Sequence, residues 1–92
     1  MDQPDYRPAL APMIRITYDP VANAAYVYLK SVSKGEAVLT RSCHHDVKET
    51  MIMVDFNADG HIVGIDIMGA RKLLSPETLE QAELPPPGYY DR

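Results

Sequence analysis

The segment from Met51 to Met68 constrains the fold more than any other stretch of the chain. It reads MIMVDFNADGHIVGIDIM, with two runs rich in Val, Ile, Met and Phe on either side of Asn57-Ala58-Asp59-Gly60. Asn and Asp side chains accept hydrogen bonds from the backbone of a tight turn, and Gly adopts a positive φ without steric cost. The segment therefore predicts a β-hairpin, closed by a type I turn with Gly60 in the left-handed region.

Size and composition predict one small globular domain. Ninety-two residues bury only about 60–65% of the surface of the unfolded chain, so stability is modest unless copies associate. The hydrophobic content is 46%, and no run approaches the roughly 18 apolar residues of a membrane helix. The start, MDQPDYRPALAPM, lacks the basic and apolar segments of a signal peptide, so we expect a cytoplasmic protein that does not bind membranes.

Charge and cysteine content narrow the function classes further. The formal net charge of -4 argues against a protein whose main role is to bind nucleic-acid phosphates, because such binding depends on clustered Lys and Arg. The single cysteine, Cys43, cannot form an internal disulfide, which agrees with a reducing compartment. We expect no nucleic-acid partner and no cofactor.

The residue pattern predicts three more strands before the hairpin. The first covers 13–18, where Ile14, Ile16 and Tyr18 alternate with polar residues. A turn over 19–23 contains Pro20, whose φ is already suited to a turn, and reverses the chain into a partner strand over 24–30. A polar loop leads to the third strand, over 36–43, whose far end resembles an exposed turn.

After Met68 the periodicity becomes helical. Residues 70–74 fit a short helical turn, and Ser75-Pro76-Glu77 is typical of a helix start. The prolines of 85–88 end the helix by about Leu84. The sequence thus predicts an α+β fold: an antiparallel five-stranded sheet built from hairpins, with a short C-terminal helix. The domain covers 13–84, between a flexible Pro-rich arm (1–12) and a Pro-rich tail (85–92).

Both sides of the predicted sheet carry apolar residues. A short helix can cover one side, which leaves Tyr26, Tyr28, Met51 and Met53 to be covered on the other if they share it. Apolar patches of that size are rare on monomers, so we expect a homo-oligomer, most simply a two-fold dimer, with these four residues at its interface. The competing covers are the Pro-rich ends of the chain or a different protein.

Two segments resemble the DUF2283 family of small prokaryotic proteins, in the order that the family shows. The D-P-x-A-D/N-A-x-Y-x-Y-L segment falls on Asp19, Pro20, Ala22, Asn23, Ala24, Tyr26, Tyr28 and Leu29. The D-G-x-I/V-V-G-I-E/D-I segment falls on Asp59, Gly60, Ile62, Val63, Gly64, Ile65, Asp66 and Ile67. The match covers about 14–74, and the resemblance implies a small α+β domain without an established activity. The arm, the tail and the cluster around Cys43 lie outside the pattern, so nothing carries over to them.

A second candidate site is the cluster Cys43-His44-His45, which His61 could join to hold a metal ion. Adjacent strand residues point to opposite faces, so His44 and His45 can coordinate one ion only if the strand has already ended. A C-x-x-C spacing typical of structural zinc is absent, and a solvated turn explains the same residues.

These observations favour a small non-enzymatic interaction protein that associates with itself and binds a protein partner. Antitoxin-like pairing with another small protein is one form that such binding could take. No catalytic residue is assigned. The alternative is a metal- or small-ligand-binding domain, or a small enzyme, that uses Cys43, His44, His45 and His61.

Overall fold

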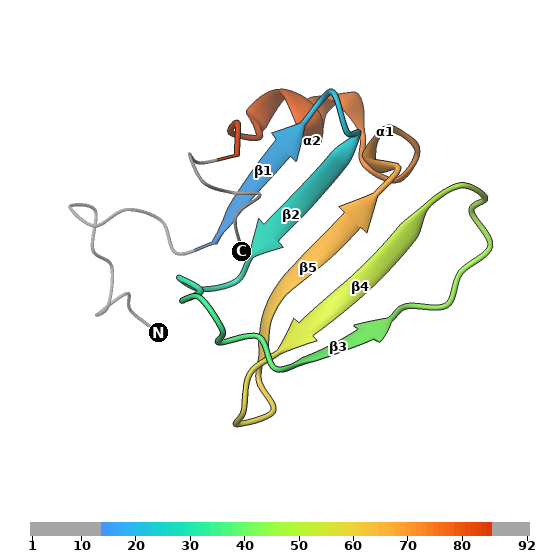
Figure 1. Ribbon diagram of the computed structural model, residues 1–92. Helices are drawn as coiled ribbons and strands as arrows, with labels where there is room; N and C mark the ends of the chain where they lie inside the picture. Colours follow the sequence, from blue (N-terminus) through green and yellow to red (C-terminus); the bar gives the residue numbers. More distant parts are fainter. Residues whose placement is uncertain (1–13, 86–92) are drawn as a thin grey trace, which may run out of the picture.

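The computed structural model describes residues 14–85. The predicted arm and, apart from Pro85, the predicted tail lie outside the described residues. Figure 1 shows the strands and the two short helices that these residues form. In chain order the elements are β1 (Arg15–Asp19), β2 (Ala24–Tyr28), β3 (Leu39–Ser42), β4 (Met51–Phe56), β5 (Ile62–Met68), α1 (Ala70–Leu73) and α2 (Pro76–Gln81).

The strands form one five-stranded sheet in the order β1-β2-β5-β4-β3, and every neighbouring pair is antiparallel. This confirms the predicted α+β class. Strand β5 lies between β2 and β4, so after β2 the chain passes to the far edge, forms β3 and returns inward (Figure 1). The third strand is shorter than the predicted 36–43, although the backbone N–H groups of Val38 and Cys43 still donate to β4, at 2.9 and 2.7 Å.

The predicted hairpin turn is present between β4 and β5. The Oδ1 atom of Asn57 accepts hydrogen bonds from the backbone N–H groups of Asp59 and His61, both at 3.0 Å. Gly60 has a φ of 83°, in the left-handed region where Gly avoids the Cβ clash. The register between β4 and β5 shifts at Asp55 and Phe56, just before this turn, which marks a β-bulge beside the turn.

One face of the sheet, the helix face, carries the hydrophobic core. Ala25 of β2, Ile67 of β5 and Ala70 of α1 are buried in it. Half-buried apolar side chains surround these three: Tyr18, Val27, Ile65, Leu73, Leu74 and Leu79. The second helix begins as predicted, since Ser75 Oγ accepts a hydrogen bond from the Thr78 N–H at 3.1 Å and Pro76 opens the helix.

The helices cover only part of the helix face. They have four and six residues, so at about 1.5 Å per residue each spans no more than about two strand spacings. In the described part of the chain, the core cluster takes its strand residues from β1, β2 and β5 and none from β4 or β3. We call β1, β2 and β5 with both helices the closed half, and β4 with β3 the open half (Figure 1).

The outer edge of β1 is also covered. After α2 the chain runs beside β1, where the Tyr18 N–H donates to the Glu83 carbonyl at 2.7 Å and the Glu83 N–H donates to the Ile16 carbonyl at 2.9 Å. The Arg15 side chain also forms an ion pair with the Glu83 carboxylate. Across residues 14–85, no helix has the length and apolar character needed to cross a membrane.

Candidate functional site

The four residues of the predicted interface do share one face, opposite the helices. Strand register aligns Tyr26 with Asp66 and Met53, and places Tyr28 and Met51 on the same side. We call this side the tyrosine face. It is less apolar than the sequence suggested, because polar side chains lie among the aromatic and Met residues: Thr17, Thr40, Asp55 and Asp66.

Tyr26 is held in a hydrogen-bonded cluster at the centre of the tyrosine face. Its side chain is only 2% exposed, and its hydroxyl donates to Asp55 Oδ2 at 2.8 Å. The Thr40 hydroxyl donates to the other oxygen, Oδ1, at 2.6 Å. Asp55 thus joins β2 to β3 across the sheet, with both oxygens engaged, which favours a structural role over that of a free base.

The Tyr26 ring fits only because residue 64 is a glycine. A Cβ atom on Gly64 would lie 2.1 Å from the Tyr26 hydroxyl oxygen and 2.4 Å from Cζ. The ring of Tyr28 packs edge-on against Tyr26, with centroids 4.7 Å apart. Gly64 and Tyr26 belong to the two separate motif segments, so the motifs are linked by this contact. Sequence reasoning missed the partnership of Tyr26 with Asp55, since residues 29 positions apart leave no local signal.

The predicted interface residues differ in how much surface they offer. Tyr26 is already buried within the single chain, whereas Met51 is 46% exposed and Tyr28 and Met53 are half-buried. An interface on the tyrosine face therefore depends on Tyr28, Met51 and Met53, and it stays a prediction.

The first motif segment has a structural task at the helix end of the sheet. Asn23 adopts a left-handed φ of 55°, and its carbonyl accepts from the N–H groups of Gly69 and Ala70, at 2.9 and 3.0 Å. Its Oδ1 accepts from the Arg71 N–H at 2.9 Å. Gly69, the N-cap of α1, has no side chain to cap the helix, so Asn23 supplies the missing acceptor from the β1–β2 turn.

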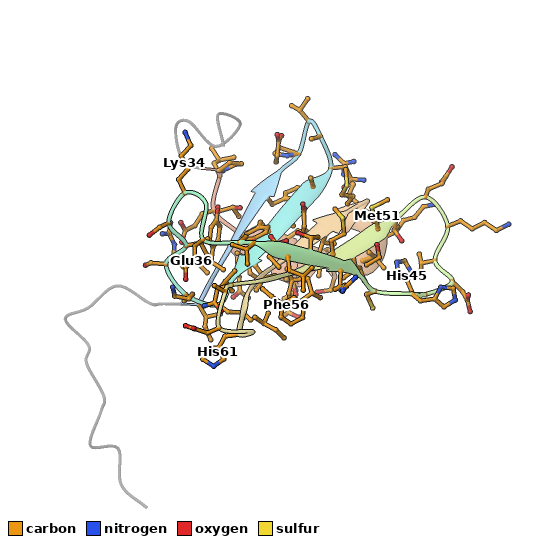
Figure 2. The ribbon with its side chains drawn as sticks, turned by 60° about the horizontal axis from the view of Figure 1, so that its bottom comes forward. Lys34, Glu36, His45, Met51, Phe56 and His61 are labelled. Carbon is orange, nitrogen blue, oxygen red and sulfur yellow. The ribbon has the colours of Figure 1, made fainter. Side chains whose placement is uncertain are left out.

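The histidine and cysteine candidates do not all come together in one chain. Cys43, His44 and His45 lie in the loop between β3 and β4, and His61 lies in the turn after β4, so the whole length of β4 separates them. Figure 2 shows His45 and His61 at opposite ends of the sheet. Among residues 14–85, no group of three or more His, Cys, Asp or Glu side chains is arranged to hold a metal ion. Metal binding by the loop cluster stays a prediction, without His61 from the same chain.

Within residues 14–85, three surface ion pairs hold connecting segments in place. The hydrogen bond from Arg15 lowers the pKa of the Glu83 carboxyl, and the one from Lys72 lowers that of Glu49. The hydrogen bond from Lys30, followed by that from the Ser33 N–H, lowers the pKa of Glu36. These partners explain the shifts without a reaction centre: Arg15–Glu83 and Lys72–Glu49 each tie a connecting residue to a strand or helix, and Lys30–Glu36 closes the loop after β2.

The comparisons with known proteins agree with the motif segments. A family model described as a protein of unknown function, DUF2283, matches residues 15–71, which is more than half of the chain. Searches of curated proteins and of solved structures give no significant match. The matched region begins with β1 and ends in α1, and so contains the sheet, the Tyr26 cluster and the Asn23 cap. By this match, the chain belongs to the DUF2283 family.

Proposed function

We propose that this domain is a non-enzymatic interaction module that associates with a second copy of itself and with a protein partner, in the cytoplasm. The observation that carries the proposal is the unequal cover of the sheet: the helices and the core cluster occupy the closed half, and the open half has no such layer in the described chain. Antitoxin-like pairing with a small protein is one form that the partner binding could take.

An apolar row begins in the open half and continues onto the neighbouring strand β5. The register aligns Leu39 of β3 with Phe56 of β4 and Ile62 of β5. Leu39 and Ile62 are 44% and 45% exposed, and Phe56, labelled in Figure 2, is half-buried. Burial of such side chains contributes about 25 cal/mol per Å² of apolar surface removed from water, which favours association through this half.

The test is sedimentation velocity of the full chain over a wide concentration range. We expect a reversible dimer, and a Leu39→Ser variant whose dissociation constant is raised by about tenfold or more, since a large apolar contact is lost. Val21→Ser is the matched control, because Val21 is 95% exposed and lies in the β1–β2 turn, away from the open half.

A Met51→Ser variant separates the two candidate surfaces. If it weakens the dimer and Leu39→Ser does not, association uses the tyrosine face and the self-association proposal stands with that interface. A chain that sediments as a monomer at every concentration would contradict self-association.

A further inference from the structure

The two edges of the sheet offer different hydrogen-bonding capacity. At β1, Glu83 supplies partners for the outward groups of Ile16 and Tyr18. At β3, the Cys43 N–H donates inward to the Ile52 carbonyl, and the register pairs Arg41 with Val54 and Leu39 with Phe56. Inward and outward bonding alternate along an antiparallel strand, so the backbone groups of Thr40 and Ser42 point away from β4. Within residues 14–85 these outward groups have no partner.

We propose that β3 pairs edge to edge with β3 of a second copy, antiparallel and about a two-fold axis, so that the two sheets join into one. This inference rests on the proposed self-association and names its surface. All four residues of β3 are exposed, and the strand lacks the Pro and Lys that protect many edge strands; its one charge is Arg41. An added strand provides backbone partners for the outward N–H and C=O groups of Thr40 and for the outward N–H of Ser42.

The charge on β3 and the neighbouring apolar row favour a second copy of the chain as the partner and set the register of the two strands. Arg41 is the only charged residue of β3. An axis at Arg41 would place two guanidinium groups opposite each other, which destabilises a strand pair. An axis at Thr40 instead places Arg41 opposite Leu39 of the second copy.

The same axis also brings the two apolar rows together. With Thr40 on the axis, Leu39 of one copy becomes the diagonal neighbour of Leu39 of the other, about 7–8 Å away. The row of Leu39, Phe56 and Ile62 then continues from one chain into the next. In this register the two Arg41 side chains are diagonal rather than directly opposite, and the apolar rows of the two copies meet, which fits a second copy of this chain.

A proline substitution tests the edge without disturbing the ladder to β4. In Ser42→Pro the lost N–H is an outward one, and the ring blocks the approach of another strand. We expect Ser42→Pro to raise the dimer dissociation constant by more than about tenfold, whereas the matched Ser42→Ala, which keeps the N–H, sediments as wild type does. Amide exchange at Cys43 and Val54 checks that β3 still pairs with β4 in the proline variant.

Cysteine pairing tests the register and does not depend on the proline variant. In a Cys43→Ser background, we expect Thr40→Cys to form an intermolecular disulfide on air oxidation, because residues on the axis have Cα atoms about 5.5 Å apart. Preferential crosslinking of Arg41→Cys in that background would overturn the register. If wild type and both Ser42 variants form equally strong dimers, the edge inference is wrong while self-association stands. A monomeric wild-type chain would contradict both self-association and the edge inference. If β3 pairs only with a strand of another protein, that protein takes the place of the second copy.

Discussion

The closed and open halves of the sheet are built from similar strands but differ in how their face and outer edge are covered. In the closed half, Ala25 and Ile67 are buried under α1, and Glu83 occupies the outer edge of β1. In the open half, Leu39 is 44% exposed and the outward backbone groups of Thr40 and Ser42 have no partner in the described chain. The difference arises because the segment after β5 forms only two short helices, and these pack beside β1, β2 and β5 (Figure 1). A small domain of this design stabilises one half from within and leaves the other available for contact.

The largest expected effect comes from breaking the contact that ties the two halves together. Gly64→Ala should lower the free energy of unfolding by about 3 kcal/mol, because the new Cβ would overlap the Tyr26 ring and displace its hydroxyl from Asp55. Urea unfolding monitored by circular dichroism measures the change. Gly35→Ala is the control, since it meets open space and costs only the strain of its left-handed φ, about 1 kcal/mol. Equal effects of the two substitutions would show that Tyr26 is not confined as described.

A smaller loss is expected when the cap of the closed half is removed. Asn23→Ala should cost about 2 kcal/mol, because alanine tolerates the left-handed backbone poorly and offers no acceptor to the Arg71 N–H. Asn23→Gly keeps the backbone conformation and should cost about half as much, and Asn23→Asp should cost least. Thermal unfolding of the three variants measures the order. A reversed order would mean that the side-chain cap does not stabilise α1.

A still smaller effect is expected in the open half when the chain is kept dilute. Leu39→Ala should lower the stability of the dissociated chain by less than about 1 kcal/mol, since a half-exposed side chain loses little burial. At higher concentration the same variant should be destabilised further relative to wild type, because association stabilises the folded form by mass action. Unfolding measured at two concentrations separates the burial lost within the chain from the association lost between chains. A difference between the variants that does not depend on concentration would leave Leu39 outside any interface.

The smallest effect concerns the covered edge and its dependence on pH. Arg15 lowers the pKa of Glu83 in the folded chain below its usual 4.5, so the pair stabilises the fold above that value and is lost as the pH falls through the folded pKa. Glu83→Gln should therefore flatten the decline of the unfolding temperature between about pH 5 and pH 3. Glu80→Gln, at an exposed position of α2, is the charge-matched control. Identical pH profiles for wild type and Glu83→Gln would remove the ion pair from the account of the β1 edge.

Local patterns predicted much of the fold, and long-range contacts explain what they missed. Alternation placed the strands, and Asn57 with Gly60 marked the hairpin turn, because both signals depend on residues close in sequence. The pairing of Tyr26 with Asp55 and the capping of α1 by Asn23 join distant segments and left no such signal. Alternation did assign Tyr28, Met51 and Met53 to the same face, but it could not show that Tyr26 is already buried there.

By itself, the sequence determined the α+β class, the strands with their two-sided alternation, the turn at Gly60 and the DUF2283 family. Only the tertiary structure decided that β5 lies between β2 and β4, that Glu83 covers the edge of β1, and that β3 is left with outward groups unpaired in the described chain. The physical reason is that alternation and turn chemistry act between near neighbours. Strand order and edge cover depend instead on which distant segments bury apolar surface and satisfy backbone groups together.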